Sequence, residues 1–170
     1  GPGDDDFWSW RDVMYRFLDH LDPDDVEAIA AMAYVEMLET GYTRVGEFHY
    51  LHNDANGHRY DNPAEMAERI FAAADSSGIG ITMLPVFYAH SDFGGAAPRQ
   101  GQRRFLNNLD SYAQLYSRIE AMLTRDSNIG IAPHSLRAVT GGELATLLEL
   151  RSGVPVHIHA AEQTKEVEAS

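Results

Sequence analysis

The stretch Val154-Pro155-Val156-His157-Ile158-His159-Ala160-Ala161-Glu162-Gln163 is a short apolar run that ends in two histidines and then a glutamate. Its length and its valines predict a β-strand. Side chains alternate between the two faces of a strand, so we expect His157 and His159 on the same face. Imidazoles followed by a carboxylate suit a metal site with a proton carrier, but two hydrogen-bonded histidines of a buried strand would give the same pattern.

Helical and strand patterns alternate along the rest of the chain. A proline at the first helical position follows a capping side chain at Asp22-Pro23 and at Asn62-Pro63, and Thr140 with Glu143 has the spacing of a capping box. Strict alternation predicts an α/β fold with a parallel sheet. The predicted helices are 7–20, 23–40, 63–77, 103–125 and 140–152, and the predicted strands are 43–51, 79–88, 128–136 and the stretch from Val154.

The composition limits the classes of function. A chain of 170 residues suits one domain with a sizeable core, and 44% apolar residues are ordinary for a globular protein. The net charge of -13 argues against a nucleic-acid partner. The sequence contains no apolar run long enough for a membrane span and no secretory signal. With no cysteine, any zinc must be held by His, Asp or Glu, and a cytoplasmic location is expected.

Polar side chains follow the carboxyl ends of the predicted strands. In parallel α/β proteins this edge of the sheet is where functional sites form. Three of the four predicted strands end in histidine, which favours a site over purely structural histidines. The residues concerned are Glu47, His49, Tyr50, Tyr88, His134, His159 and Glu162. The long aperiodic loop 89–102 lies near this edge, and we interpret it as a mobile lid.

Five segments of the chain resemble the formimidoylglutamate deiminases, a family of the amidohydrolase superfamily. They are Phe7-Trp8-Ser9-Trp10-Arg11, Ala28 to Gly41, Glu47-Phe48-His49-Tyr50-Leu51-His52, Ala132 to Val139, and His157 to Val167. The resemblance implies a partial (β/α)8 TIM barrel of the metal-dependent hydrolase type, about strands two to five. Residues 1–170 would then be a single segment of the catalytic barrel, with its N- and C-terminal parts missing.

The resemblance also implies an activity. It is the zinc-dependent hydrolysis of N-formimino-L-glutamate to N-formyl-L-glutamate and ammonia in histidine degradation, with one Zn²⁺ in each complete active site. The substrate would be a small molecule, the partners would include no nucleic acid and no membrane, and the full-length protein would be a homodimer.

The resemblance assigns roles to particular residues. His159 matches the metal ligand of the fifth barrel strand, and Glu162 matches the glutamate that carries protons between the water and the departing nitrogen. The substrate-binding residues that it implies are Arg11, Tyr50, His134 and Arg137, of which His134 is also implied to be catalytic. His157 would be structural. His49 and His52 receive no role.

The ligands that would complete a zinc site lie on other strands of the family's barrel. One ligand cannot hold zinc in a catalytic geometry, so we expect the 170-residue chain to be inactive by itself. Two other interpretations stay open: another amidohydrolase deaminase that acts on a purine or pterin ring, and a non-catalytic structural or binding segment. Arg11 and Arg137 favour a dicarboxylate substrate over a neutral ring.

Overall fold

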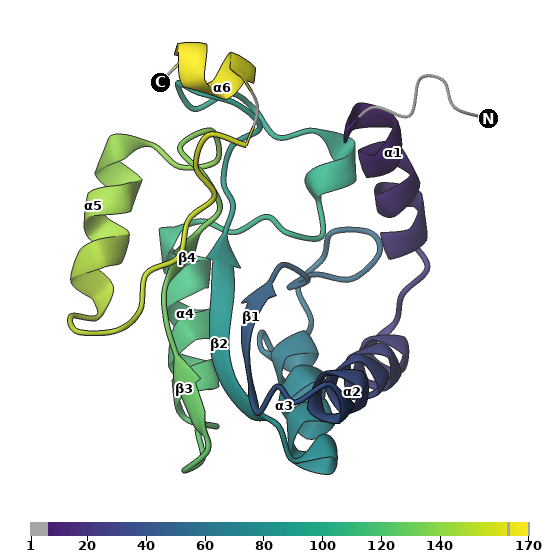
Figure 1. Cartoon of the computed structure of the whole chain (residues 1–170). Helices are drawn as coiled ribbons and strands as arrows, with labels where there is room; N and C mark the ends of the chain where they lie inside the picture. Colours follow the sequence, from purple (N-terminus) through teal and green to yellow (C-terminus); the bar gives the residue numbers. More distant parts are fainter. Residues whose placement is uncertain (1–6, 163, 170) are drawn as a thin grey trace.

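A parallel sheet with helices packed on one of its faces forms the frame of the molecule (Figure 1). The computed structural model describes residues 7–162 and 164–169. The helices are α1 (Phe7–Leu18), α2 (Pro23–Glu39), α3 (Glu65–Ser77), the 3₁₀ turn η1 (Gln100–Gln102), α4 (Leu109–Glu120), α5 (Gly141–Leu150) and α6 (Thr164–Ala169). The strands are β1 (Arg44–His49), β2 (Gly80–Phe87), β3 (Ser127–Ile129) and β4 (Ala132–Pro133).

The strands confirm the α/β fold with a parallel sheet. Their order is β1-β2-β3, and β4 pairs with β2 beyond β3. The register joins Val45 to Ile81 and Met83 to Ile129, and every pairing is parallel. The stretch after Pro155 extends the sheet through two isolated parallel bridges, at Val156 and at His159, instead of a continuous strand.

The predicted strand 128–136 is divided because its backbone changes partner. The Gly130 amide donates to the Met83 carbonyl of β2, whereas the Ile131 amide donates to the carbonyl of Pro155. At His134 the backbone bonds to β2 again, through the Phe87 carbonyl. Residues 130–134 therefore connect β2 with the stretch after Pro155.

The predicted helix 103–125 is wrong at its beginning and too long at its end. Helix α4 begins only at Leu109, after a capping box in which Asn108 and Ser111 bond each other's backbone amides. The residues before it leave the helical path because the Arg104 carbonyl accepts hydrogen bonds from the amides of His52 and Asn53. The capping boxes of α2, from Asp22, and of α5, from Thr140, confirm the predicted helix starts there.

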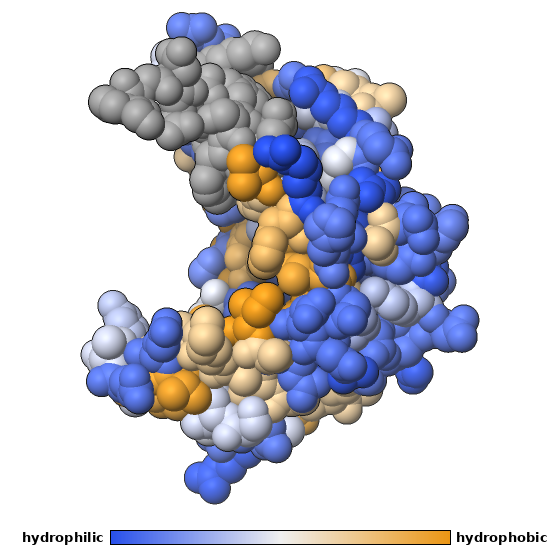
Figure 2. All heavy atoms as spheres, turned by 90° about the vertical axis from the view of Figure 1, so that its right-hand side faces the viewer, coloured by the Kyte–Doolittle hydropathy of each residue, from blue (hydrophilic) through white to orange (hydrophobic). Residues whose placement is uncertain are grey.

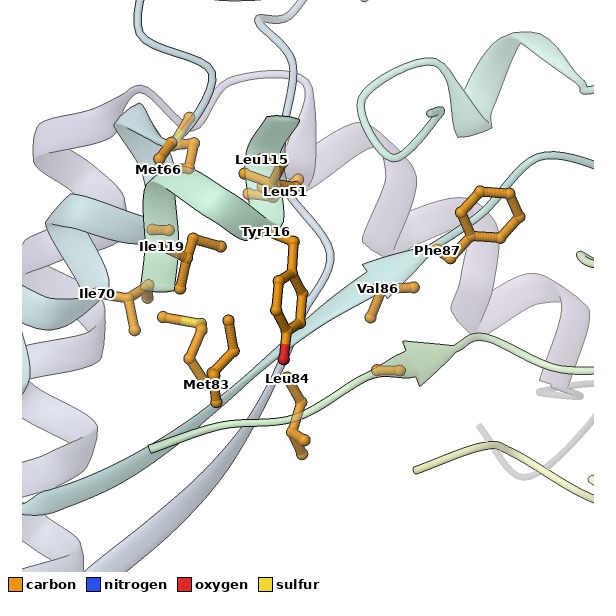
Figure 3. Close-up of a cluster of buried hydrophobic side chains, with 14 of the residues drawn as sticks. Leu51, Met66, Ile70, Met83, Leu84, Val86, Phe87, Leu115, Tyr116 and Ile119 are labelled. Atoms are coloured by element: carbon orange, nitrogen blue, oxygen red, sulfur yellow. The ribbon is translucent and has the colours of Figure 1, made fainter. Parts of the chain in front are cut away.

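The core lies between the sheet and the helices α3 and α4 (Figure 3). Strand β2 is buried on both faces, as its apolar sequence predicts. The Phe87 ring packs edge-on against Tyr112 of α4, with ring centroids 5.5 Å apart, and the Tyr112 hydroxyl donates to the Pro85 carbonyl. Figure 3 places Met83 near Ile70 and Ile119, which belong to the two covering helices.

The opposite face of the sheet is concave, and in profile the molecule is hollowed on one side with hydrophobic residues exposed there (Figure 2). Small and large residues alternate on this face. Leu84 approaches both Gly46 of β1 and Gly130, where a Cβ atom would lie 2.6 Å from a Leu84 methyl carbon. A Cβ on Gly130 would also lie 2.5 Å from the Pro155 carbonyl oxygen, so only glycine allows the stretch after Pro155 to pack this closely.

No helix in the part of the chain that the structure describes is long and apolar enough to cross a membrane.

Substitution of Gly130 tests this packing. Gly130→Ala should lower the free energy of unfolding by about 1–3 kcal/mol, because the added methyl overlaps backbone and Leu84 atoms that cannot both yield. Gly142→Ala is the matched control: it lies in α5 with no atom within 4 Å of the added carbon, and it should be neutral or stabilising by up to about 1 kcal/mol. Urea unfolding of both variants measures the difference, and equal midpoints would contradict the packing argument.

Candidate active site

A cavity of about 410 Å³ opens at the carboxyl ends of the strands. Its walls come from α1, from the ends of β1 and β2, from the segment before α4, and from the stretches after β4 and Pro155. The lining residues are Met14, Tyr15, Leu18, Tyr50, Leu51, Tyr88, Phe105, His134, Arg137, His159 and Glu162. The cavity therefore lies at the edge where the sequence predicts a site.

His159 is held between two residues of the β1 end. The Tyr50 hydroxyl lies 3.0 Å from His159 Nε2, and the Phe48 ring lies 4.6 Å from the imidazole, centroid to centroid. Burial raises the pKa of the Tyr50 hydroxyl, which is therefore protonated at neutral pH. The His159 amide donates to the His134 carbonyl, so the main chain fixes the two histidines side by side.

His134 lies in the middle of an aromatic group. Its ring centroid is 4.6 Å from that of Tyr88, 5.5 Å from that of Tyr50 and 5.2 Å from that of His159. Burial lowers the pKa of His134 to about 3, with the charges of His159 and Arg137 acting in the same direction. The imidazole is therefore neutral at pH 7, and its Nδ1 atom has no hydrogen-bond partner among the residues that the structure describes.

Arg137 and Glu162 form an ion pair at the rim of the cavity. Arg137 Nη2 donates to Glu162 Oε2 over 2.6 Å, and the two side chains are 19% and 32% exposed. Glu162 reaches this position through a sharp turn in which Ala161 has φ of 55°, a left-handed conformation that non-glycine residues seldom adopt. The turn brings the carboxylate back over the cavity after His159.

Five of the six predicted site side chains meet at this cavity: Tyr50, His134, Arg137, His159 and Glu162. The sixth residue, Arg11, belongs to α1, the helix whose next turns contribute Met14, Tyr15 and Leu18 to the lining. The side chain of Arg11 itself lies outside the described residues.

Other polar residues at the strand ends do not join the site. The Glu47 carboxylate accepts a 2.5 Å hydrogen bond from the hydroxyl of Tyr34 in α2. Glu47 therefore lies on the face of β1 opposite to Phe48. His49 is also buried on the helix side, where its ring meets that of His52 at 5.3 Å. His157 is exposed and lies outside the cavity lining. Strand alternation separates Glu47 and His49 from Phe48 and Tyr50.

One wall of the cavity is aromatic, and the sequence pattern did not predict that Phe105 belongs to it. Phe105 contacts Tyr15, Tyr50 and Tyr88 at centroid distances of 5.4 to 6.0 Å, but its place in the predicted helix 103–125 assigned it to a core stripe. Tyr88 was visible as a polar residue at a strand end, and its hydroxyl accepts a 2.8 Å hydrogen bond from the buried Gln102 side chain. The loop 89–102 is thus attached to the cavity at its end, and its mobility stays a prediction.

Potential metal ligands are not clustered among the described residues. Among residues 7–162 and 164–169, no group of three or more His, Asp or Glu side chains is arranged to hold a metal ion. A catalytic zinc site needs about three protein ligands. These residues therefore do not form a complete zinc site by themselves.

A parallel sheet with polar side chains gathered at the carboxyl ends of its strands is the arrangement of α/β enzymes. The sequence pattern of the amidohydrolase family matches residues 1–170, and the chain belongs to this family. It is 48% identical to the formimidoylglutamate deiminase of Pseudomonas aeruginosa over 99% of its length, and it spans 38% of that protein.

Solved structures agree with this placement. The crystal structure of an amidohydrolase from Brucella melitensis is 55% identical, with a TM-score of 0.95, over 99% of this chain and 38% of that one. A triazine hydrolase variant matches at a TM-score of 0.74 and 14% identity, over 96% of this chain and 37% of that one, and shows the fold alone. These likenesses support a partial TIM-barrel-like fold, in line with the expected fold class.

The buried histidines behind β1 predict how stability depends on pH. Burial lowers the pKa of His52 to about 4, against 6.5 for an unperturbed histidine, and it also lowers the pKa of His49. Between pH 6.5 and pH 4, His52 binds a proton in the unfolded chain but not in the folded chain. The free energy of unfolding should therefore fall by about 3 kcal/mol as pH drops from 6.5 to 4.

Urea unfolding between pH 7.5 and 4.5 measures this slope. His52→Gln keeps an N–H group for the Val86 carbonyl, 2.9 Å from His52 Nε2, and should reduce the slope because glutamine does not titrate. His58→Gln is the control, since the His58 side chain is 80% exposed. An equal slope in the His52 and His58 variants would overturn the assignment.

Proposed function

We propose that this chain is part of the catalytic barrel of a metal-dependent hydrolase, about strands two to five of eight. The reaction is the addition of water to the formimino carbon of N-formimino-L-glutamate, which gives N-formyl-L-glutamate and ammonia in histidine degradation. The observation that carries the proposal is the convergence of Tyr50, His134, Arg137, His159 and Glu162 on one cavity. The 48% identity to a formimidoylglutamate deiminase supports the choice of substrate.

Recognition of the substrate rests on its two carboxylates. Arginine binds carboxylates through two parallel hydrogen bonds, and Arg137 lies at the cavity rim where one carboxylate would approach. Arg11 on α1 is the candidate for the other carboxylate. His134 is neutral and half-buried beside Arg137, so it can contribute one hydrogen bond to the bound substrate without adding charge.

Glu162 is the candidate proton carrier. The water loses a proton as it attacks the formimino carbon, and the departing nitrogen must gain protons before it leaves as ammonia. A carboxylate within reach of both atoms performs both transfers. In the structure Glu162 is paired with Arg137, so a substrate carboxylate that binds Arg137 competes with Glu162 and releases it for this task.

His159 is the candidate metal ligand. A bound zinc ion would lower the pKa of water and polarise the formimino group. In this chain the Tyr50 hydroxyl lies against His159 Nε2, and when this nitrogen binds another group the hydroxyl can turn to the substrate. The remaining ligands belong to other parts of the barrel, because the described residues do not form a complete set.

The test uses the full-length protein that contains this chain. We expect ammonia release from N-formimino-L-glutamate and none from guanine, a substrate of the ring-deaminase class. Glu162→Gln should lower kcat at least about 100-fold because the amide cannot carry a proton. Glu149→Gln, an exposed position of α5, should leave kcat unchanged. Ammonia from guanine alone, or full activity of the Glu162 variant, would overturn the proposal.

The isolated 170-residue chain gives a complementary prediction. It should release no ammonia from N-formimino-L-glutamate in the presence of zinc, because one candidate ligand cannot hold the ion in a catalytic geometry. A coupled ammonia assay and metal analysis of the dialysed protein measure both properties. Stoichiometric zinc together with turnover would contradict this expectation. The homodimeric state and the cytoplasmic location stay predictions for the full-length protein.

A further inference from the structure

Helix α1 forms one wall of the candidate active site, and its attachment is unusual. It contributes Met14, Tyr15 and Leu18 to the cavity. It lies beside the segment that contains η1, far away in the sequence (Figure 1). Residues 101–105 of this segment contact the C-terminal half of α1 and the turn that follows it.

Arg104 makes the central contact. Its side chain is only 1% exposed, and its guanidinium donates to the carbonyls of Leu18 and Leu21, the latter at 2.9 Å. Its Nε donates to the Asn53 carbonyl at 3.1 Å. Leu18 is the last residue of α1, where the helix carries its negative dipole end, and a buried cation complements that end. Leu21 lies in the turn between α1 and α2, so Arg104 also fixes the chain that leaves the helix.

The neighbours of Arg104 act on the same helix. Arg103 forms a 2.7 Å ion pair with Asp19, just after the end of α1. The Phe105 ring lies 5.9 Å from that of Tyr15. Gly101 lets the Tyr15 ring approach the backbone: a Cβ atom there would lie 2.7 Å from Tyr15 Cδ2. Four of the five residues 101–105 thus contact α1 or the turn that follows it.

We propose that Arg104 is a positioning residue that holds α1 as a wall of the active site, so that substrate affinity depends on it although it does not line the cavity. The proposal rests on the proposed function for its affinity readout. Lysine cannot replace Arg104, because three carbonyls in different directions need the planar fork of donors that only arginine has. Loss of the contact would release α1, and with it the candidate substrate ligand Arg11, while His134, His159 and Glu162 stay in place.

The first test measures α1 directly in the 170-residue chain by hydrogen–deuterium exchange. Arg104→Met should raise exchange in residues 7–18 by about tenfold, with the peptides of β2 and α4 unchanged, since only the helix is released. Arg151→Met is the matched control: it removes an equally charged arginine whose 2.8 Å ion pair joins Glu120 on the surface. Equal exchange in α1 of both variants overturns the proposal.

A second variant guards against global unfolding. Gly101→Ala leaves Arg104 intact but displaces Tyr15, and should loosen α1 selectively. If Arg104→Met raises exchange in every segment, the Gly101 variant decides: selective exchange in α1 supports the positioning role, and uniform exchange overturns it.

The third measurement uses the full-length protein. Arg104→Met should raise KM for N-formimino-L-glutamate by about tenfold and leave kcat within about twofold, because binding geometry changes while the reacting groups do not. An unchanged KM, or a fall in kcat alone, overturns the proposal. If the unsubstituted protein releases no ammonia from this substrate, the proposed function fails, and the exchange measurement still decides whether Arg104 holds α1.

Discussion

The backbone pairing between residues 131–134 and 155–159 is the constraint on which the candidate site depends. Three main-chain hydrogen bonds make it, from Ile131 to Pro155, from His157 to Ile131 and from His159 to His134. This pairing sets the two histidine rings 5.2 Å apart, and it sets the starting point of the turn at Ala161 that returns Glu162 to Arg137. Main-chain bonds hold side chains to a fixed register, so the two imidazole rings lie side by side because the His159 amide bonds the His134 carbonyl.

Alternation along the strands divides the polar residues into two populations. On β1 and its extension, Phe48 contacts His159, whereas Glu47 and His49 point to the helices and are buried there. Tyr50, beyond the regular strand, returns to the cavity side. The same sequence cluster therefore serves two purposes: one set of groups faces a solvent-accessible cavity, and the other set is buried, neutral or hydrogen-bonded, between sheet and helices.

The features that could be predicted from the sequence are those that neighbouring residues determine. The capping boxes at Asp22 and Thr140 are local, the apolar run of β2 is local, and the polar strand ends follow from the parallel order. The start of α4 was mistaken because Arg103 to Leu106 continue an apparently helical pattern, and their actual path is set by bonds to residues about 50 and 85 positions earlier, at Asn53 and Leu18. Such long-range contacts leave no periodic signal, which is also why Phe105 and Arg104 were not linked to the site.

The parts of the cavity are held in place in different ways. Its floor comes from strand ends that are bonded into the sheet, and His159 lies on this floor, whereas Glu162 lies at the rim in its ion pair with Arg137. Its aromatic wall comes from α1 and the segment 101–105, which hold each other through side-chain contacts with backbone carbonyls. Under the proposed function, a change in the wall would alter how tightly a substrate is held, whereas a change at the strand ends would also alter the candidate reacting groups. The polar residues at the strand ends are marked by a local sequence pattern, whereas the contacts of the segment 101–105 with α1 are not.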